Sequence, residues 1–208
     1  MARKEEIKNY KRTETFNHYD SMDCPFVTII TKVDITNLVK YCRIHKHYYA
    51  TIGWCLMKAA NQIYEMRVRN EDGKFYVYDK MNTEFMAPFD NHVAGYYACE
   101  MKDNFLEFIE EYDKQLALFK KTQKSIYNND NGEIWCTCEP WMEFTSIQPP
   151  FDKKCHTQEF IWDKIKEEND KFSINLCIMF HHGYLYGEQV GQFLNILNDI
   201  IKDFNFEF

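Results

Sequence analysis

The sequence has few of the residues that mark linkers, membrane spans or nucleic-acid-binding surfaces. Glycine and proline account for only 7 and 5 of the 208 residues, so nothing indicates a flexible or low-complexity segment. No apolar run approaches the ~18 residues of a membrane-spanning helix, so we expect no membrane association. Lysine and arginine form no basic tract and the net charge is −7, which disfavours a nucleic-acid partner.

The N-terminal segment MARKEEIKNYKRTE also lacks the apolar stretch of a secretory signal, and we therefore expect a cytoplasmic protein. In that compartment the eight cysteines are expected to be reduced thiols rather than disulfides. Hydrophobic residues make up 45% of the chain and aromatic residues 17%. That is enough for the core of a single domain over residues 1–208 and for an aromatic-lined cavity.

Hydrophobic periodicity alternates between strand and helix patterns along the chain. Strand or extended character is expected over residues 26–33, 74–79, 84–88, 94–100 and 133–147, and helical spacing over residues 52–66 and 103–121. The segments do not follow strict strand–helix–strand repeats. The sequence therefore predicts an α/β fold, an α+β two-layer sandwich in which a mixed β-sheet is flanked by helices.

The clearest structural unit lies at the C-terminus. Residues 173–180 alternate apolar and polar side chains as a strand does, and an amphipathic helix is expected after Gly187. His181 and His182 lie between the two, at the end of a strand, where α/β sheets often place chemistry. Taken alone, two adjacent histidines are more often structural or surface residues than catalytic ones.

Two other short patterns offer pairs of metal ligands, namely Cys136 with Cys138 and His45 with His47. A structural zinc site needs four ligands and usually has CxxC spacing. We therefore favour ordinary structural or surface roles for these residues and expect no bound metal.

The segment HHGYLYG (181–187) resembles the HHxxxDG signature of chloramphenicol acetyltransferases. Further segments are similar to that family in order along nearly the whole chain: NYKRTETFNHY (9–19), CPFVTIITKVDIT (24–36), residues 46–79 and CTCEPWMEFTSI (136–147). The resemblance implies the fold of that family, a homotrimer with active sites between subunits. It also implies an acetyl-CoA-dependent O-acetyltransferase that acts on the hydroxyl of chloramphenicol or a similar small acceptor.

By this resemblance His182 is the general base. Its neutral imidazole would take the proton of the acceptor hydroxyl while the oxygen attacks the thioester carbon of acetyl-CoA. Thr137 matches the position of the family's serine. Its hydroxyl would donate to the oxygen on which negative charge develops.

The main departure from the family concerns the residues that support this site. Arg12 matches the family arginine that pairs with the motif aspartate, but Tyr186 occupies the aspartate position. A phenol carries no charge at neutral pH, so this ion pair cannot form, although Tyr186 can stack on Arg12. We therefore expect the loop that carries His182 to be weakly held and the activity to be reduced.

The resemblance also implies two binding sites. The acceptor would contact Tyr19, Cys24, Phe26, Tyr96, Ala98, Ile147 and Phe151. Coenzyme A would contact Trp141, Lys46 and Lys164.

Three other functions remain open. The chain could acetylate a different small acceptor, bind coenzyme A or a drug without turnover, or form the core of a dihydrolipoyl acyltransferase. An acceptor screen and binding calorimetry separate the first two. No lipoyl domain or linker accompanies the chain, which makes the third the weakest.

Overall fold

The computed structural model describes residues 2–128, 131–150 and 155–204. Its helices are α1 (Thr13–Asp20), α2 (Thr36–His45), α3 (Tyr48–Ala60), α4 (Phe105–Thr122) and α5 (Gly187–Lys202), with a short 3₁₀ helix η1 (Tyr64–Arg67). Its strands are β1 (Lys4–Glu6), β2 (Phe26–Asp34), β3 (Val68–Glu71), β4 (Lys74–Tyr78), β5 (Asn82–Pro88), β6 (Ala94–Cys99), β7 (Glu133–Glu139), β8 (Glu159–Asp163), β9 (Lys166–Glu168) and β10 (Lys171–His181).

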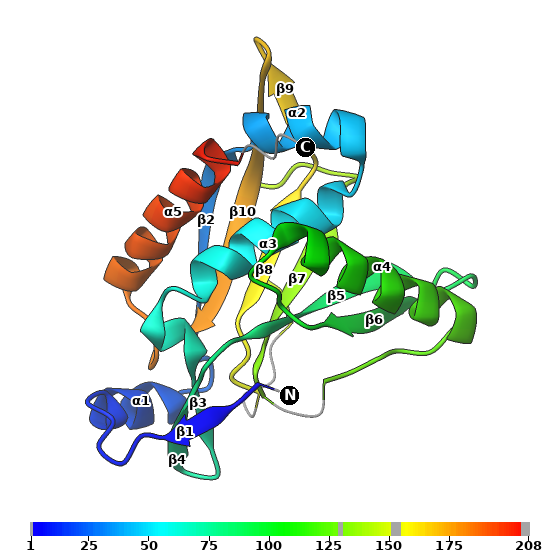
Figure 1. The fold of residues 1–208 in the computed structure, drawn as a ribbon. Coiled ribbons are helices and arrows are strands. Elements are labelled where there is room, and N and C mark those ends of the chain that lie inside the picture. The colour runs from blue at the N-terminus through cyan, green and yellow to red at the C-terminus, as the bar shows by residue number, and fades with distance from the viewer. Residues whose placement is uncertain (1, 129–130, 151–154, 205–208) are drawn as a thin grey trace.

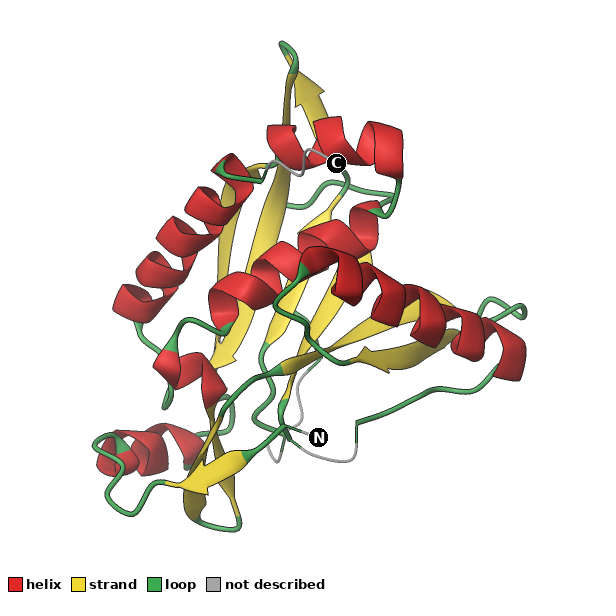
Figure 2. Ribbon diagram, viewed as in Figure 1, coloured by secondary structure: helices red, strands yellow, loops and turns green. Residues whose placement is uncertain are grey.

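A mixed seven-stranded sheet forms the centre of the molecule, in the order β2-β10-β8-β7-β5-β6 with β9 paired to β10. Strand β10 is antiparallel to β2 and β8, whereas β7 is parallel to both β8 and β5. Helices α3, α4 and α5 lie over one face of this sheet (Figure 1). Figure 2 shows the same arrangement by secondary structure, which confirms the predicted fold class.

Strands β1, β4 and β3 form a separate antiparallel sheet. It lies beside α1 at the end of the main sheet where β10 terminates (Figure 1). Within the described residues, no helix has both the length and the apolar composition that crossing a membrane requires.

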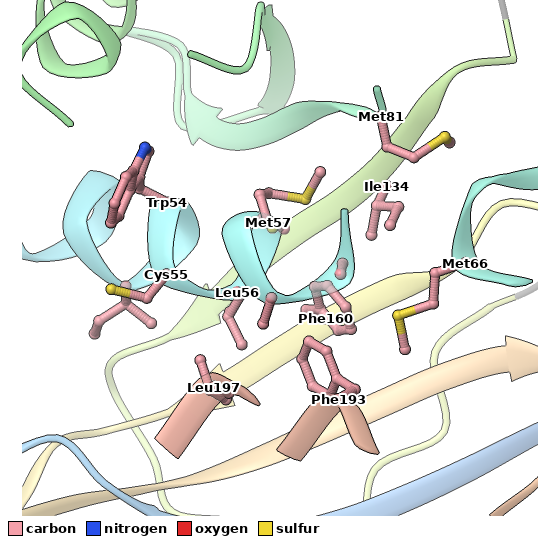
Figure 3. Close-up of a cluster of buried hydrophobic side chains, with 14 of the residues drawn as sticks. Trp54, Cys55, Leu56, Met57, Met66, Met81, Ile134, Phe160, Phe193 and Leu197 are labelled. Atoms are coloured by element: carbon pink, nitrogen blue, oxygen red, sulfur yellow. The ribbon is translucent and has the colours of Figure 1, made fainter. Parts of the chain in front are cut away.

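The core lies between the main sheet and the helices. Because side chains alternate between the two faces of a strand, Ile134 of β7 and Phe160 of β8 both point to the helical side and are fully buried. Phe160 stacks on Phe193 of α5 with ring centroids 5.1 Å apart. Helix α3 adds Leu56 and Met57 to the same cluster (Figure 3).

Helix α3 corrects one boundary prediction. A helix was expected over residues 52–66, but α3 begins at Tyr48 and ends at Ala60. Ten of its 13 residues are buried, so it lacks a polar stripe whose period would mark its ends. Asn61 follows the last residue of the helix, and its side chain donates to the Met57 carbonyl at 3.0 Å.

The other predicted elements are confirmed to within a few residues, with one exception. The segment expected to be extended over residues 133–147 is a strand only as far as Glu139. The loop that follows packs Phe144 against Ile161 and Cys177, on the sheet face opposite the helices.

We predict opposite effects for two glycine-to-alanine substitutions in helices. A Cβ on Gly53 would come within 2.6 Å of the Phe85 ring, whereas one on Gly191 would meet nothing within 4 Å. Gly53→Ala should therefore lower the free energy of unfolding by about 1–3 kcal/mol through overpacking. Gly191→Ala should raise it by up to ~1 kcal/mol through helix propensity. Urea denaturation followed by circular dichroism measures both, and stabilisation by Gly53→Ala would contradict the close approach of α3 to β5.

Candidate active site

His182 directly follows β10 and is fixed by two backbone carbonyl groups. Its main-chain N–H donates to the Pro25 carbonyl at 2.8 Å, and its ring Nδ1 lies 3.0 Å from the Leu185 carbonyl oxygen. Because a carbonyl oxygen can only accept, Nδ1 carries the proton and Nε2 of the neutral ring keeps its lone pair. His182 can therefore accept a proton through Nε2.

Aromatic side chains pack around the ring of His182. The ring of Tyr19, on α1, lies 4.3 Å from it between centroids, and Tyr186 meets it edge-on at 5.5 Å. Phe26, the first residue of β2, is buried, and Cys24 is exposed two residues earlier. The structure thus brings Tyr19 into contact with His182 and places Phe26 and Cys24 near the start of β2, beside the same loop.

Arg12 connects α1 to the loop that follows β10. Its Nη1 donates to the Tyr184 carbonyl at 2.7 Å, and its guanidinium carbon lies 4.5 Å from the centre of the Tyr186 ring. Its Nη2 lies 3.5 Å from Oε1 of Glu65 on η1. The stacking of Tyr186 on Arg12 is as predicted. The expectation of a weakly held loop is corrected, because Glu65 supplies a carboxylate and the Tyr184 carbonyl a direct hydrogen bond.

A second polar cluster surrounds His181, whose side chain is fully buried. Its Nδ1 accepts from the Gly183 N–H at 3.0 Å, and its Nε2 lies 3.4 Å from Oδ1 of Asp20. Nε2 of His156 lies 3.2 Å from the same carboxylate oxygen, and its Nδ1 lies 3.1 Å from the Tyr184 hydroxyl. Asp20 therefore joins α1 to β10 and to the segment before β8.

Asp20, His156 and His181 each place one possible metal-ligating atom within 4.8 Å of the others. The bond from Gly183 disfavours a metal at this cluster. When Nδ1 of a neutral histidine accepts a hydrogen bond, the proton sits on Nε2, which is the atom that would have to bind the ion. The hydrogen bonds of the cluster are those that His156 makes with Asp20 and Tyr184 and that His181 accepts from Gly183, and the expectation of no bound metal stays a prediction.

A cavity of about 500 Å³ lies on the other side of the main sheet. Its strand residues alternate with the core residues of β5, β6, β7 and β8, so they point away from the helices. Three of the predicted site residues line it: Thr137, Tyr96 and Ile147. Ala98 is buried on the same face of β6, opposite Glu84 of β5.

Three glutamates that were not predicted line this cavity, and two of them have a raised pKa. Burial raises the pKa of Glu84 to about 8, with a further contribution from the charge of Glu133. Burial also raises the pKa of Glu159 to about 7, although a hydrogen bond from Thr137 acts in the other direction. That bond joins Oγ1 of Thr137 to Oε1 of Glu159 at 3.3 Å. The Thr137 hydroxyl, which was predicted to take part in the reaction, is therefore hydrogen-bonded to the carboxyl group of Glu159.

Two of the three predicted coenzyme A contacts lie close together. Trp141 is 75% exposed, and the N–H of Lys164 donates to the carbonyl of the adjacent Met142 at 3.0 Å, so Trp141 and Lys164 lie close together. Lys46 is exposed at the end of α2, and no hydrogen bond or ion pair within the described residues joins it to them. Phe151, predicted to contact the acceptor, lies outside the described residues.

His182 is not among the described residues that line the cavity. In a single chain the predicted site is thus divided. Tyr19 lies with His182 after β10, whereas Tyr96 and Thr137 line the cavity on the sheet.

Known structures share this fold. A chloramphenicol acetyltransferase superposes with a TM-score of 0.81 at 19% identity, covering 97% of this chain and all of that one (100%). A probable dihydrolipoamide acetyltransferase from Listeria monocytogenes superposes with a TM-score of 0.71 at 14% identity, covering 95% and 92% of the two chains. At these identities the likeness shows the fold alone, which is one found among acetyltransferases.

The sequence comparisons define the family. The family model described as chloramphenicol acetyltransferase matches residues 3–198. Chloramphenicol acetyltransferase 3 of Escherichia coli is 24% identical, with 94% of each chain covered. The chloramphenicol acetyltransferase of Bacillus pumilus is 27% identical, with 94% of this chain and 91% of the relative covered. The chain belongs to the chloramphenicol acetyltransferase family and is an enzyme of the acyltransferase class.

We predict that His181 makes the fold sensitive to mild acid. Burial, followed by the charge of His156, lowers its pKa to about 4. Below pH ~6.5 His181 binds a proton in the unfolded chain but stays neutral in the folded protein. The free energy of unfolding therefore falls as pH falls from ~6.5 towards 4. Between pH 7 and pH 5 this residue should account for a loss of about 2 kcal/mol in the free energy of unfolding.

His181→Asn is the matched variant, because its side-chain oxygen can still accept from the Gly183 N–H. The raised pKa values of Glu84 and Glu159 act in the opposite sense, since those groups bind protons more tightly when folded. The informative quantity is therefore the difference in pH dependence between wild type and variant, measured by urea denaturation at each pH. Parallel curves would show that His181 does not titrate with folding.

Proposed function

We propose that this acyltransferase moves the acetyl group of acetyl-CoA to a hydroxyl group of chloramphenicol or a similar small acceptor, with His182 as the general base. The observation that carries the proposal is the bond between Nδ1 of His182 and the Leu185 carbonyl. It leaves Nε2 as the proton acceptor, which is the state a general base needs before the reaction.

In the proposed reaction the acceptor oxygen attacks the thioester carbon while Nε2 of His182 takes the hydroxyl proton. A carbon–oxygen bond forms, the carbon–sulfur bond breaks, and the thiolate of coenzyme A leaves. The proton on Nε2 then passes to that thiolate, so His182 returns to its neutral form. The Leu185 carbonyl keeps the ring oriented while it is positively charged.

Thr137 is proposed to donate to the acetyl carbonyl oxygen as negative charge develops there. Its hydroxyl now donates to Glu159, so that bond must break before the hydroxyl hydrogen can turn about the Cβ–Oγ1 bond towards the substrate. The few χ1 positions of a β-branched side chain limit any further movement of the oxygen. We therefore expect Thr137 to contribute less than a preorganised donor would.

The separation of His182 from the cavity in one chain supports a shared site. We propose a homotrimer in which His182 of one subunit faces the cavity of its neighbour. In this arrangement Arg12, Tyr186 and Glu65 position the base from one subunit. Thr137 and the cavity of the adjacent subunit would bind the acceptor.

The experiment that tests the reaction is release of free coenzyme A from acetyl-CoA, with and without chloramphenicol. We predict that His182→Ala lowers the acceptor-dependent rate about 10²–10⁴-fold, the usual contribution of a general base. His181→Asn should retain at least about a tenth of the rate, because His181 faces Asp20 rather than the cavity.

Circular dichroism of both variants serves as the folding control. Equal losses in the two variants would mean that His182 is not the base. No release with chloramphenicol or with a panel of other small alcohols and amines would contradict the proposed activity. The chain would then be a coenzyme A-binding homologue without turnover, which calorimetry with coenzyme A detects.

We predict that the purified protein has three times the single-chain mass of 25.2 kDa, measured by light scattering after size-exclusion chromatography. His182→Ala removes the base, and Thr137→Trp fills the cavity that Thr137 lines, so each variant alone should be inactive. Activity should return when the two are co-expressed. Random mixing places an intact His182 against an intact cavity in about a quarter of the interfaces. A monomer, or a mixture that stays inactive, would contradict the shared site.

A further inference from the structure

The cavity on the sheet is acidic as well as aromatic. Among the described residues its lining includes the carboxyl groups of Glu84, Glu139 and Glu159 and no lysine, arginine or histidine. Trp135 and Tyr96 contribute aromatic rings. A cavity that bound only a neutral, apolar acceptor would not need buried carboxyl groups, since each costs free energy to desolvate.

Glu84 and Glu159 lie on either side of Trp135. Glu84 of β5 pairs with Trp135 of β7, and Trp135 pairs with Glu159 of β8. Because neighbouring strands are ~4.8 Å apart, the three side chains form one row on one face of the sheet. The indole is fixed by its Nε1–H, which donates to Oε1 of Glu133 at 3.0 Å.

The carboxyl group of Glu84 has no partner within the described residues. The residue is only 6% exposed and lines the cavity, yet it makes no hydrogen bond or ion pair there. Glu159, by comparison, accepts from Thr137. The carboxyl group of Glu84 therefore faces the cavity rather than another side chain. Its position at a cavity wall indicates that a ligand supplies the partner.

We propose that the acceptor carries an ammonium group, bound by the carboxyl groups of Glu84 and Glu159 and by the ring of Trp135. An ammonium ion favours the ionised form of Glu84, which burial disfavours in the free protein, and gives it a partner through a charge-assisted hydrogen bond. An indole is the aromatic ring that attracts cations best. The inference rests on the proposed function, because it names the acceptor class of that same cavity. The substrate class is a small amino alcohol whose hydroxyl receives the acetyl group.

Chloramphenicol and its free amine form a matched pair of probes. The amine has the same nitrophenyl propanediol skeleton, but it lacks the dichloroacetyl group and its nitrogen is an ammonium ion at neutral pH. Titration calorimetry of the wild-type protein with each probe requires no turnover. We expect the amine to bind about 10-fold more tightly than chloramphenicol. Equal affinities, tighter binding of chloramphenicol, or no binding of either probe would overturn the proposal.

Glutamine variants test which residues bind the cation. Glu84→Gln and Glu159→Gln keep the shape of the side chain and should each weaken binding of the amine about 10-fold, while binding of chloramphenicol stays the same or improves. Glu188→Gln, on the exposed first turn of α5, is the control and should change neither affinity. A loss that affects both probes equally would overturn the assignment.

Release of coenzyme A with the same two probes separates this inference from the proposed function. His182-dependent release with no preference for the amine overturns the cationic acceptor and leaves the acetyltransferase proposal intact. Binding of the amine that depends on Glu84, without any release that depends on His182, supports the cation site and overturns the proposed reaction.

Discussion

Strand β10 sets the position of everything at the histidine end of the molecule, because it is paired with β2 from Ser173 to His181 and with β8 from Leu176 to Met179. Its last residue, His181, is paired with Phe26 and stacks on Phe16 of α1 with ring centroids 4.9 Å apart. The next turn of the chain is equally constrained, because a Cβ on Gly183 would come within 2.8 Å of the Phe16 Cα. Glycine is needed for this close approach. The packing of α1 thus determines where His182 lies.

Arg12 shows how the loop can be supported without the aspartate of the family motif. Its hydrogen bond to the Tyr184 carbonyl is charge-assisted, and such bonds contribute about 1.5–3 kcal/mol. Stacking on Tyr186 adds roughly 0.5–2 kcal/mol. The ion pair with Glu65 is mostly buried, so the cost of desolvating two charges offsets much of its attraction. The carbonyl and the phenol ring therefore contribute most of the support, and the carboxylate mainly neutralises the guanidinium.

Local sequence pattern predicted those elements whose two sides differ in polarity. Strand β10 and helix α5 alternate clearly, and their positions were predicted to within a few residues. Helix α3 is buried nearly all round, so no polar stripe marked its start at Tyr48. Long-range contacts left no local signal at all. Glu65 supplies Arg12 with the carboxylate that the family motif would place at position 186, which is 121 residues further along the chain. Asp20 meets His156 and His181 only after α1 packs on the end of β10.

The glutamates of the cavity were missed for the same reason, and they bear on specificity. Glu84 and Glu159 lie in separate strands, and only the register of β5, β7 and β8 places them around Trp135. An apolar cavity distinguishes acceptors weakly, by shape, whereas an unpaired buried group rejects any ligand that fails to satisfy it. Glu159 also accepts from Thr137 through Oε1, and a carboxylate can accept several hydrogen bonds. Thr137 has a single hydroxyl hydrogen, which cannot go to Oε1 and to the acetyl oxygen at once, so the charge of the acceptor and the availability of that hydroxyl are coupled through one side chain.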